Sequence, residues 1–197
     1  NNIIKYFSII MAFICLTIFF YSDLIIIFLF GEKWIESAIY LRLLILASFF
    51  YMQELFCRLI FKVYDKTEKI LQLEIIKKIF QSFTIFYALY YEDVKLLLYG
   101  FILTNIFGFI LNFYFCNKVQ NKIGYNILFV ILKILVISII IFMVFKFIGN
   151  FFGISIVKSL SLLPIMLIVY FWCLNILRVI EIKYEIKKIK SYLVRKN

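Results

Sequence analysis

The feature that most constrains this chain is a succession of apolar runs, each about twenty residues long, separated by short charged segments. Hydrophobic residues make up 65% of the 197 residues, which leaves little sequence for a water-soluble domain. The runs are continuous, whereas the strands of a membrane β-barrel alternate polar and apolar residues. The pattern therefore predicts an all-α, polytopic helical membrane protein with about six transmembrane helices in contact with the lipid bilayer.

The apolar runs also indicate how the chain is organised. Predicted helices cover about Lys5–Phe30, Ser37–Tyr64, Ile70–Tyr91, Val94–Cys116, Tyr125–Ile148 and Ile154–Leu177. Ser22 and Asp23 interrupt the first run, and Pro164 is the expected kink point of the last. The third run is cleanly apolar only from Ile79 onward, so its first half is expected to face headgroups, a cavity or other helices. We expect four helices in residues 1–124, a terminal pair in 125–179 and a basic amphipathic cytoplasmic tail in 180–197.

The positive charge of the chain follows a topological pattern. The formal net charge is +11, and histidine is absent. If segment 65–69 is cytoplasmic, fifteen Lys and Arg residues lie on that side of the membrane and four on the other. This asymmetry matches the positive-inside rule, so the charge predicts cytoplasmic termini rather than nucleic-acid binding. The four cysteines lack Cys-x-x-Cys spacing, which favours packing roles, and no metal or cofactor motif is visible.

Ionisable residues inside a predicted span are the candidate substrate-binding residues, because charge is costly in hydrocarbon. Glu54 and Arg58 are four residues apart and are expected to pair on one helix face. Arg42 lies near the outer end of the same helix. Either this helix lines a hydrated path on which Arg58 meets an anion, or Arg58 only reaches toward the inner surface while Glu54 neutralises it.

Lys77 and Lys78 extend the candidate site on the next predicted helix. They lie at about the depth of Arg58 and could form a cationic vestibule for a phosphate-bearing head group, although the positive-inside rule also explains them. Adjacent residues differ by about 100° around a helix, so the two lysines should face different sides. We expect Lys78 to face the substrate, because it shares a helix face with Glu74.

Small and polar residues on the fourth predicted helix indicate close packing. Asn105 and Asn112 are seven residues apart on one face, which predicts hydrogen bonds to neighbouring helices. Gly100 and Gly108 are expected to permit close helix approach.

Several short motifs occur in a characteristic order. One predicted helix ends in Leu29–Trp34 (Leu-Phe-Gly-Glu-Lys-Trp), and the next opens with Ser37-Ala38 and continues through the leucine-rich segment Leu41–Leu46. After a charged hinge, another helix starts with Leu71–Leu73 (Leu-Gln-Leu). Over roughly residues 20 to 120, this order resembles the C-terminal half of Wzx-type polysaccharide biosynthesis flippases, which move O-antigen repeat units and belong to the multidrug/oligosaccharidyl-lipid/polysaccharide exporter superfamily.

The resemblance implies part of a two-lobe flippase fold that moves an undecaprenyl-pyrophosphate-linked oligosaccharide across the bacterial inner membrane for surface polysaccharide assembly. It implies transport without an enzymatic step or a cofactor. Family members have about twice as many helices, which alternate access between two lobes, so an N-terminal lobe of the same protein is an expected partner and the chain is expected to be a fragment or a truncated product. Tyr91–Lys95 and Tyr64–Lys66 depart from the family, which often has glycine-rich or small residues at these turns.

Three alternatives remain open. A drug/cation antiporter of the same superfamily should carry cavity acids, and Glu54 is the one deep acid in the sequence. An O-antigen polymerase or lipid-linked glycosyltransferase should carry a large external loop, and the predicted external loops are short. A structural membrane subunit would have no transport function.

The charge pattern generates a topology prediction. Reporters fused after Lys69, Lys122 and Lys196 should report a cytoplasmic location, and reporters fused after Lys33, Asp93 and Asn150 should report an external one. Paired reporters active on opposite sides of the membrane provide the measurement. One reporter on the wrong side would contradict the six-helix topology.

Overall fold

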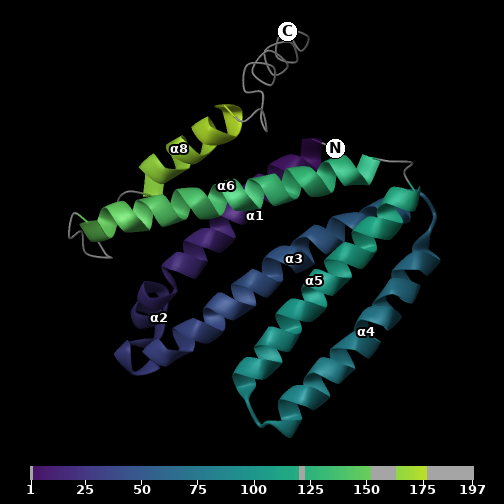
Figure 1. Cartoon of the computed structure of the whole chain (residues 1–197), viewed down its shortest axis with the longest axis horizontal. Coiled ribbons are helices and arrows are strands. Elements are labelled where there is room, and N and C mark those ends of the chain that lie inside the picture. Colours follow the sequence, from purple (N-terminus) through teal and green to yellow (C-terminus); the bar gives the residue numbers. More distant parts are fainter. Residues whose placement is uncertain (1, 120–122, 152–162, 177–197) are drawn as a thin grey trace. The chain divides into compact units, whose positions relative to one another are not determined.

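A computed structural model describes residues 2–119, 123–151 and 163–176, which are almost entirely helical (Figure 1). The elements are α1 (Asn2–Phe20), α2 (Ser22–Phe30), the 3-10 helix η1 (Glu32–Ser37), α3 (Ala38–Val63), α4 (Thr67–Tyr90), α5 (Val94–Val119), α6 (Ile123–Phe151) and α8 (Leu163–Ile176). No strand occurs in the part of the chain that the structure describes. The all-α prediction is therefore confirmed over these residues.

The described residues contain three or four candidate membrane spans, so the predicted six are not confirmed. Among the described residues, three helical segments are long and apolar enough to cross a membrane: Glu32–Val63, Val94–Val119 and Phe129–Ile148. A fourth is the pair Lys5–Phe20 and Ser22–Phe30, if these two helices, bent by 68°, form one span. The bend lies where Ser22 and Asp23 were expected to interrupt the first run.

Two of the predicted spans are not among these long, apolar segments. Helix α4 is 24 residues long, but the charged residues of its first half keep it outside the set of candidate spans that the described residues contain. Helix α8 has 14 described residues, fewer than the roughly 20 that cross a bilayer. The start of the predicted last helix and the tail at 180–197 lie outside the described residues, whereas Pro164, the expected kink point, is described as the second residue of α8.

The chain divides into two compact units, Asn1–Leu132 and Lys133–Asn197. In the first, α5 lies between α3 and α4 and packs along both of them, while α1 packs on α3 (Figure 1). In the second, Ser138 of α6 hydrogen-bonds to Tyr170 of α8, with 3.1 Å between Oγ and Oη, and both side chains are buried. The charged candidates between residues 42 and 78 all belong to the first unit.

Short reverse turns keep α3, α4 and α5 side by side and antiparallel. Asp65 and Glu92 adopt left-handed backbone conformations, with φ of 51° and 49°, directly after α3 and α4. The amide of Lys66 then donates to the carbonyl of Phe61 at 2.8 Å, and the amide of Asp93 donates to that of Ala88 at 3.3 Å. Such six-residue closures satisfy carbonyls at a helix C-terminus and reverse the chain within a few residues.

Two glycines of α5 permit the close packing expected of them. A Cβ atom at Gly100 would lie 2.7 Å from Thr84 Cβ of α4. At Gly108 it would lie 2.8 Å from Glu54 Oε2 of α3 and 2.9 Å from Lys77 Cδ of α4. Gly108 therefore leaves the space in which side chains of α3 and α4 meet across α5.

This space generates a stability prediction. Replacing Gly108 with valine should lower the thermal stability of the detergent-solubilised protein by about 1–3 kcal/mol, because the new methyl groups overlap Glu54 and Lys77. Ile110→Val is the control on the same helix, since that side chain is 55% exposed. Equal melting temperatures for the two variants would show that Gly108 does not set the spacing.

Candidate functional site

The candidate site is a cluster of charged and amide side chains held between α3, α4 and α5, and Glu54 is its centre. Glu54 is completely buried. Its Oε1 accepts hydrogen bonds from Arg58 Nη2 at 2.5 Å and Asn112 Nδ2 at 3.2 Å, and its Oε2 accepts one from Lys77 Nζ at 2.7 Å. The buried carboxylate is thus bonded to groups from all three helices, as a charge removed from water requires.

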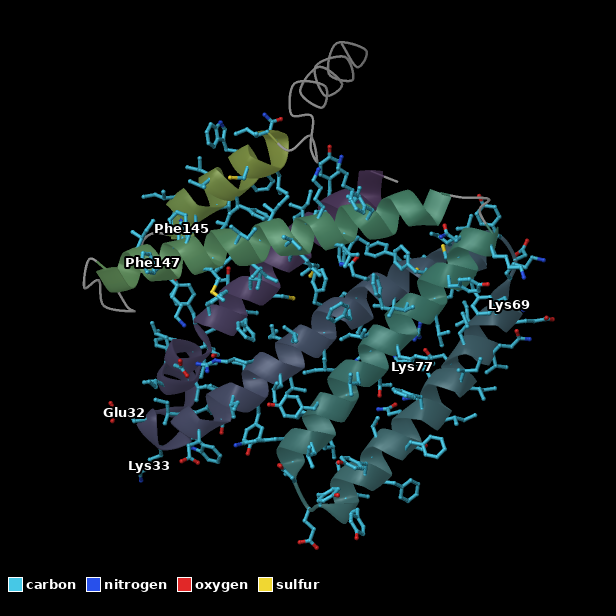
Figure 2. All side chains as sticks on the ribbon, in the orientation of Figure 1. Glu32, Lys33, Lys69, Lys77, Phe145 and Phe147 are labelled. Atoms are coloured by element: carbon cyan, nitrogen blue, oxygen red, sulfur yellow. The ribbon has the colours of Figure 1, made fainter. Side chains whose placement is uncertain are left out.

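Lys77 is the second buried charge of the cluster, with 5% of its surface exposed. Besides Glu54, its ammonium donates to Asn105 Oδ1 at 3.0 Å and lies 5.2 Å from the ring centroid of Tyr51. These three neighbours satisfy the donors and the charge of the lysine. In Figure 2, Lys77 lies in the layer between α4 and α5, whereas Lys69 lies near the start of α4.

Arg58 and Glu74 form the open edge of the cluster. Arg58 Nη2 is shared between Glu54 of its own helix and Glu74 of α4, with which it forms a second ion pair. The side chains of Arg58 and Glu74 are 20% and 27% exposed, in contrast to the completely buried Glu54. Solvent is therefore excluded from Glu54 but can reach Arg58 and Glu74.

The formal charges of the cluster balance, because Glu54 and Glu74 oppose Arg58 and Lys77. The two asparagines complete the hydrogen bonding: the Asn105 amide donates to the Phe101 carbonyl at 3.0 Å, and the Asn112 amide donates to the Gly108 carbonyl at 2.9 Å. Pairing and hydrogen bonding together are what make four charges tolerable within packed helices. Removal of any one charge leaves an opposite charge uncompensated.

The structure brings together some of the predicted site residues and separates others. Glu54 pairs with Arg58 as their spacing predicted, and Lys77 joins them. Lys77 and Lys78 point to different sides of α4, as expected. Lys77 is the one that enters the cluster, whereas Lys78 is exposed and donates to Gln81 Oε1 at 2.9 Å.

Arg42 lies apart from the cluster. It precedes Glu54 by twelve residues, which is roughly 18 Å along a helix. Its guanidinium pairs with Asp23, and its Nε donates to Ser22 Oγ at 2.6 Å. Both partners belong to the first turn of α2, so Arg42 ties α3 to the bend between α1 and α2.

Sequence reasoning missed the bond between Lys77 and Glu54 and the roles of Glu74 and Asp23 as partners of arginines. The signal for these pairs was weak, since each joins side chains that are 16 to 23 residues apart on different helices. The two asparagines were correctly expected to bond to neighbouring helices. Another buried polar contact, Ser8 Oγ to Gln53 Oε1 at 2.8 Å, links α1 to α3.

Comparison of the chain with protein-family models, with curated proteins and with solved structures finds no match.

The difference between the adjacent lysines generates a prediction about stability. Lys77→Gln should lower the stability of the solubilised protein by about 3 kcal/mol or more, because Glu54 loses a buried counter-charge. Lys78→Gln should change it by less than about 0.5 kcal/mol, as is usual for exposed positions. Thermal unfolding followed by fluorescence or circular dichroism gives the comparison.

The double variant Glu54→Gln, Lys77→Gln tests whether the two residues act as a pair. It should be less destabilised than the sum of the single variants, because it leaves no unpaired charge of this pair. Additive losses would mean that Glu54 and Lys77 stabilise the helices independently.

Proposed function

We propose that the chain is part of an integral inner-membrane flippase that moves an undecaprenyl-pyrophosphate-linked oligosaccharide outward for surface polysaccharide assembly. The observation that carries the proposal is the charged cluster between α3, α4 and α5, with the guanidinium of Arg58 at its open edge. Charges within transmembrane helices generally face a bundle interior or a water-filled path. A cluster with one accessible cation suits the recognition of an anion.

The exposure of Arg58 and Glu74 supports a polar environment beside them. Hydrocarbon cannot solvate these groups, so water or another polar protein surface must cover the open edge of the cluster. We take this edge to line the substrate path. The further helices of a two-lobe transporter, expected from the resemblance, would supply the opposite wall.

The mechanism follows from the problem that the substrate poses. The lipid tail can remain in the bilayer, whereas the pyrophosphate and the sugars cannot enter hydrocarbon without large desolvation costs. The planar guanidinium of Arg58 can donate two parallel hydrogen bonds to a phosphate. Lys77 supports the site from within by holding Glu54, and the inner-surface lysines raise the local concentration of anionic substrate.

A drug/cation antiporter is the second candidate, and the second carboxylate of the cluster favours it. The structure places Glu74 beside Glu54 through their common partner Arg58, so the cluster holds two acids rather than the one evident from the spans. A cation carrier would use these acids as its binding groups and Arg58 as their counter-charge. The two functions therefore assign opposite roles to the same residues.

Export by the full-length protein tests the flippase proposal. Arg58→Ala should lower the outward movement of lipid-linked oligosaccharide, per molecule of protein, by about tenfold or more, the loss expected for a charge-assisted bond to phosphate. Lys62→Ala is the control, because that lysine is exposed at the end of α3. The measurement is surface polysaccharide, normalised to protein level in the membrane.

The same variants separate the two candidates. Wild-type export from both would remove Arg58 from the substrate path and contradict the flippase mechanism. Cation efflux that is lost in Glu54→Gln, with no export by the wild-type protein, would favour the antiporter.

A further inference from the structure

The two carboxylates that share Arg58 are held very unequally. Glu54 is completely buried, and besides Arg58 it has Lys77 and Asn112 as hydrogen-bond donors. Glu74 is 27% exposed, and its buried Oε1 forms the ion pair with Arg58 but has no hydrogen-bond partner among the described residues. The bond from Arg58 to Glu74 is therefore easier to replace by another anion than the bond from Arg58 to Glu54.

Loss of Arg58 would leave Glu54 with two of its three donors, in a site that water does not reach. The same loss would leave Glu74 at the surface, where water can solvate a carboxylate. Lys78 lies one turn further along α4 and is exposed, so its ammonium can pair with Glu74 at i, i+4 spacing. Its present partner is the neutral amide of Gln81, a weaker acceptor than a carboxylate.

A phosphate-bearing anion that approaches the open edge meets Glu74 first as a competitor. Guanidinium groups bind carboxylate and phosphate through the same planar pair of N–H donors, so one anion excludes the other from that side of Arg58. Glu74 is also negatively charged and repels the incoming anion until it moves away. The geometry makes Glu74, and not Glu54, the group that must yield.

We propose that Glu74 is a built-in competitor for the anion-binding side of Arg58, and that Lys78 receives Glu74 when a phosphate-bearing ligand displaces it. This inference rests on the proposed function and deepens it by assigning an exchange step within the cluster. In the empty site Glu74 keeps the cluster neutral, which avoids a net positive charge beside the bilayer. In the occupied site it lowers the affinity, which favours release after transport.

Binding measurements on the full-length protein in phosphatidylcholine nanodiscs test this exchange, with inorganic pyrophosphate as the probe. Glu74→Gln should bind pyrophosphate about tenfold more tightly than the wild type, because a competing charge is removed. Glu74→Asp keeps the competing carboxylate charge and should therefore stay within about twofold of the wild type. Arg58→Gln should lose binding.

Two further variants provide a control and a test of the role of Lys78. Glu92→Gln removes an exposed acid from the turn after α4 and should leave the affinity unchanged within about twofold, because distant exposed charges are screened. Lys78→Gln should weaken binding, because the displaced Glu74 loses its cationic acceptor. A merely structural role for Glu74 would lower the melting temperature of Glu74→Gln without tightening the binding of pyrophosphate.

The outcomes distinguish this inference from the proposed function. Pyrophosphate binding that Arg58→Gln abolishes but Glu74→Gln leaves unchanged would overturn the competitor role and keep the anion site. No binding by any variant would overturn the proposed function as well. Repetition in phosphatidylglycerol nanodiscs identifies the source of the phosphate: weaker pyrophosphate binding there would assign the site to a lipid headgroup, and unchanged binding to a pyrophosphate.

Discussion

The bond between Lys77 and Glu54 is the interaction on which the arrangement of α3, α4 and α5 depends. Helices α3 and α4 contact each other sparsely, whereas each packs along α5. The bond joins the two outer helices directly, at 2.7 Å, and it passes over α5 where Gly108 has no side chain. A buried charge pair has strict requirements for partners and distances, so it fixes the rotation of both outer helices about their axes.

Apolar packing alone would define this rotation poorly. Many exposed and buried side chains of α3 and α4 are equally apolar, and within a bilayer lipid tails are as apolar as such side chains. On α4 the buried residues include Leu73, Lys77 and Ala88, and large apolar residues such as Phe83 and Phe86 remain exposed. The helix thus buries a lysine while exposing phenylalanines, which is the reverse of a water-soluble helix. Its orientation follows from polar partners rather than from hydrophobicity.

The helices were predictable from the sequence because their ends are marked by charge and turn residues. Helix α3 extends from Ala38 to Val63 where Ser37–Tyr64 was predicted, and α4 and α5 also begin within a few residues of their predicted starts. The Glu54–Arg58 pair was predictable because i, i+4 spacing fixes proximity within one helix. Neither argument predicts which residues of different helices contact each other. Which face of α4 meets α3 depends on helix rotation, and for that reason Lys77 could not be selected over Lys78 from spacing alone.

The number of spans was harder to predict because length and apolarity are properties of single helices. The surroundings of the charged residues of α4, in contrast, are formed by the neighbouring helices. Charged residues make the first half of α4 polar, yet Lys77 is buried and Glu74 is paired with Arg58. A helix whose charges are satisfied by adjacent helices does not need to be apolar throughout. The hydropathy of a single helix therefore does not decide whether a helix of this kind crosses a membrane.

The sequence suggested a cationic vestibule, and the structure contains a neutral cluster, which changes the energetics of anion binding. In a vestibule of unpaired lysines and arginines, an anion would gain the full Coulomb attraction, but the empty state would carry uncompensated charges beside hydrocarbon. In the neutral cluster each cation is already paired with a carboxylate. An arriving anion therefore gains only the difference between its own interaction free energy with the cation and that of the carboxylate that it replaces. That difference is smallest at a fully bonded, buried group such as Glu54 and largest at an exposed group such as Glu74. Affinity at such a site is set by the carboxylate that leaves as much as by the cation that stays.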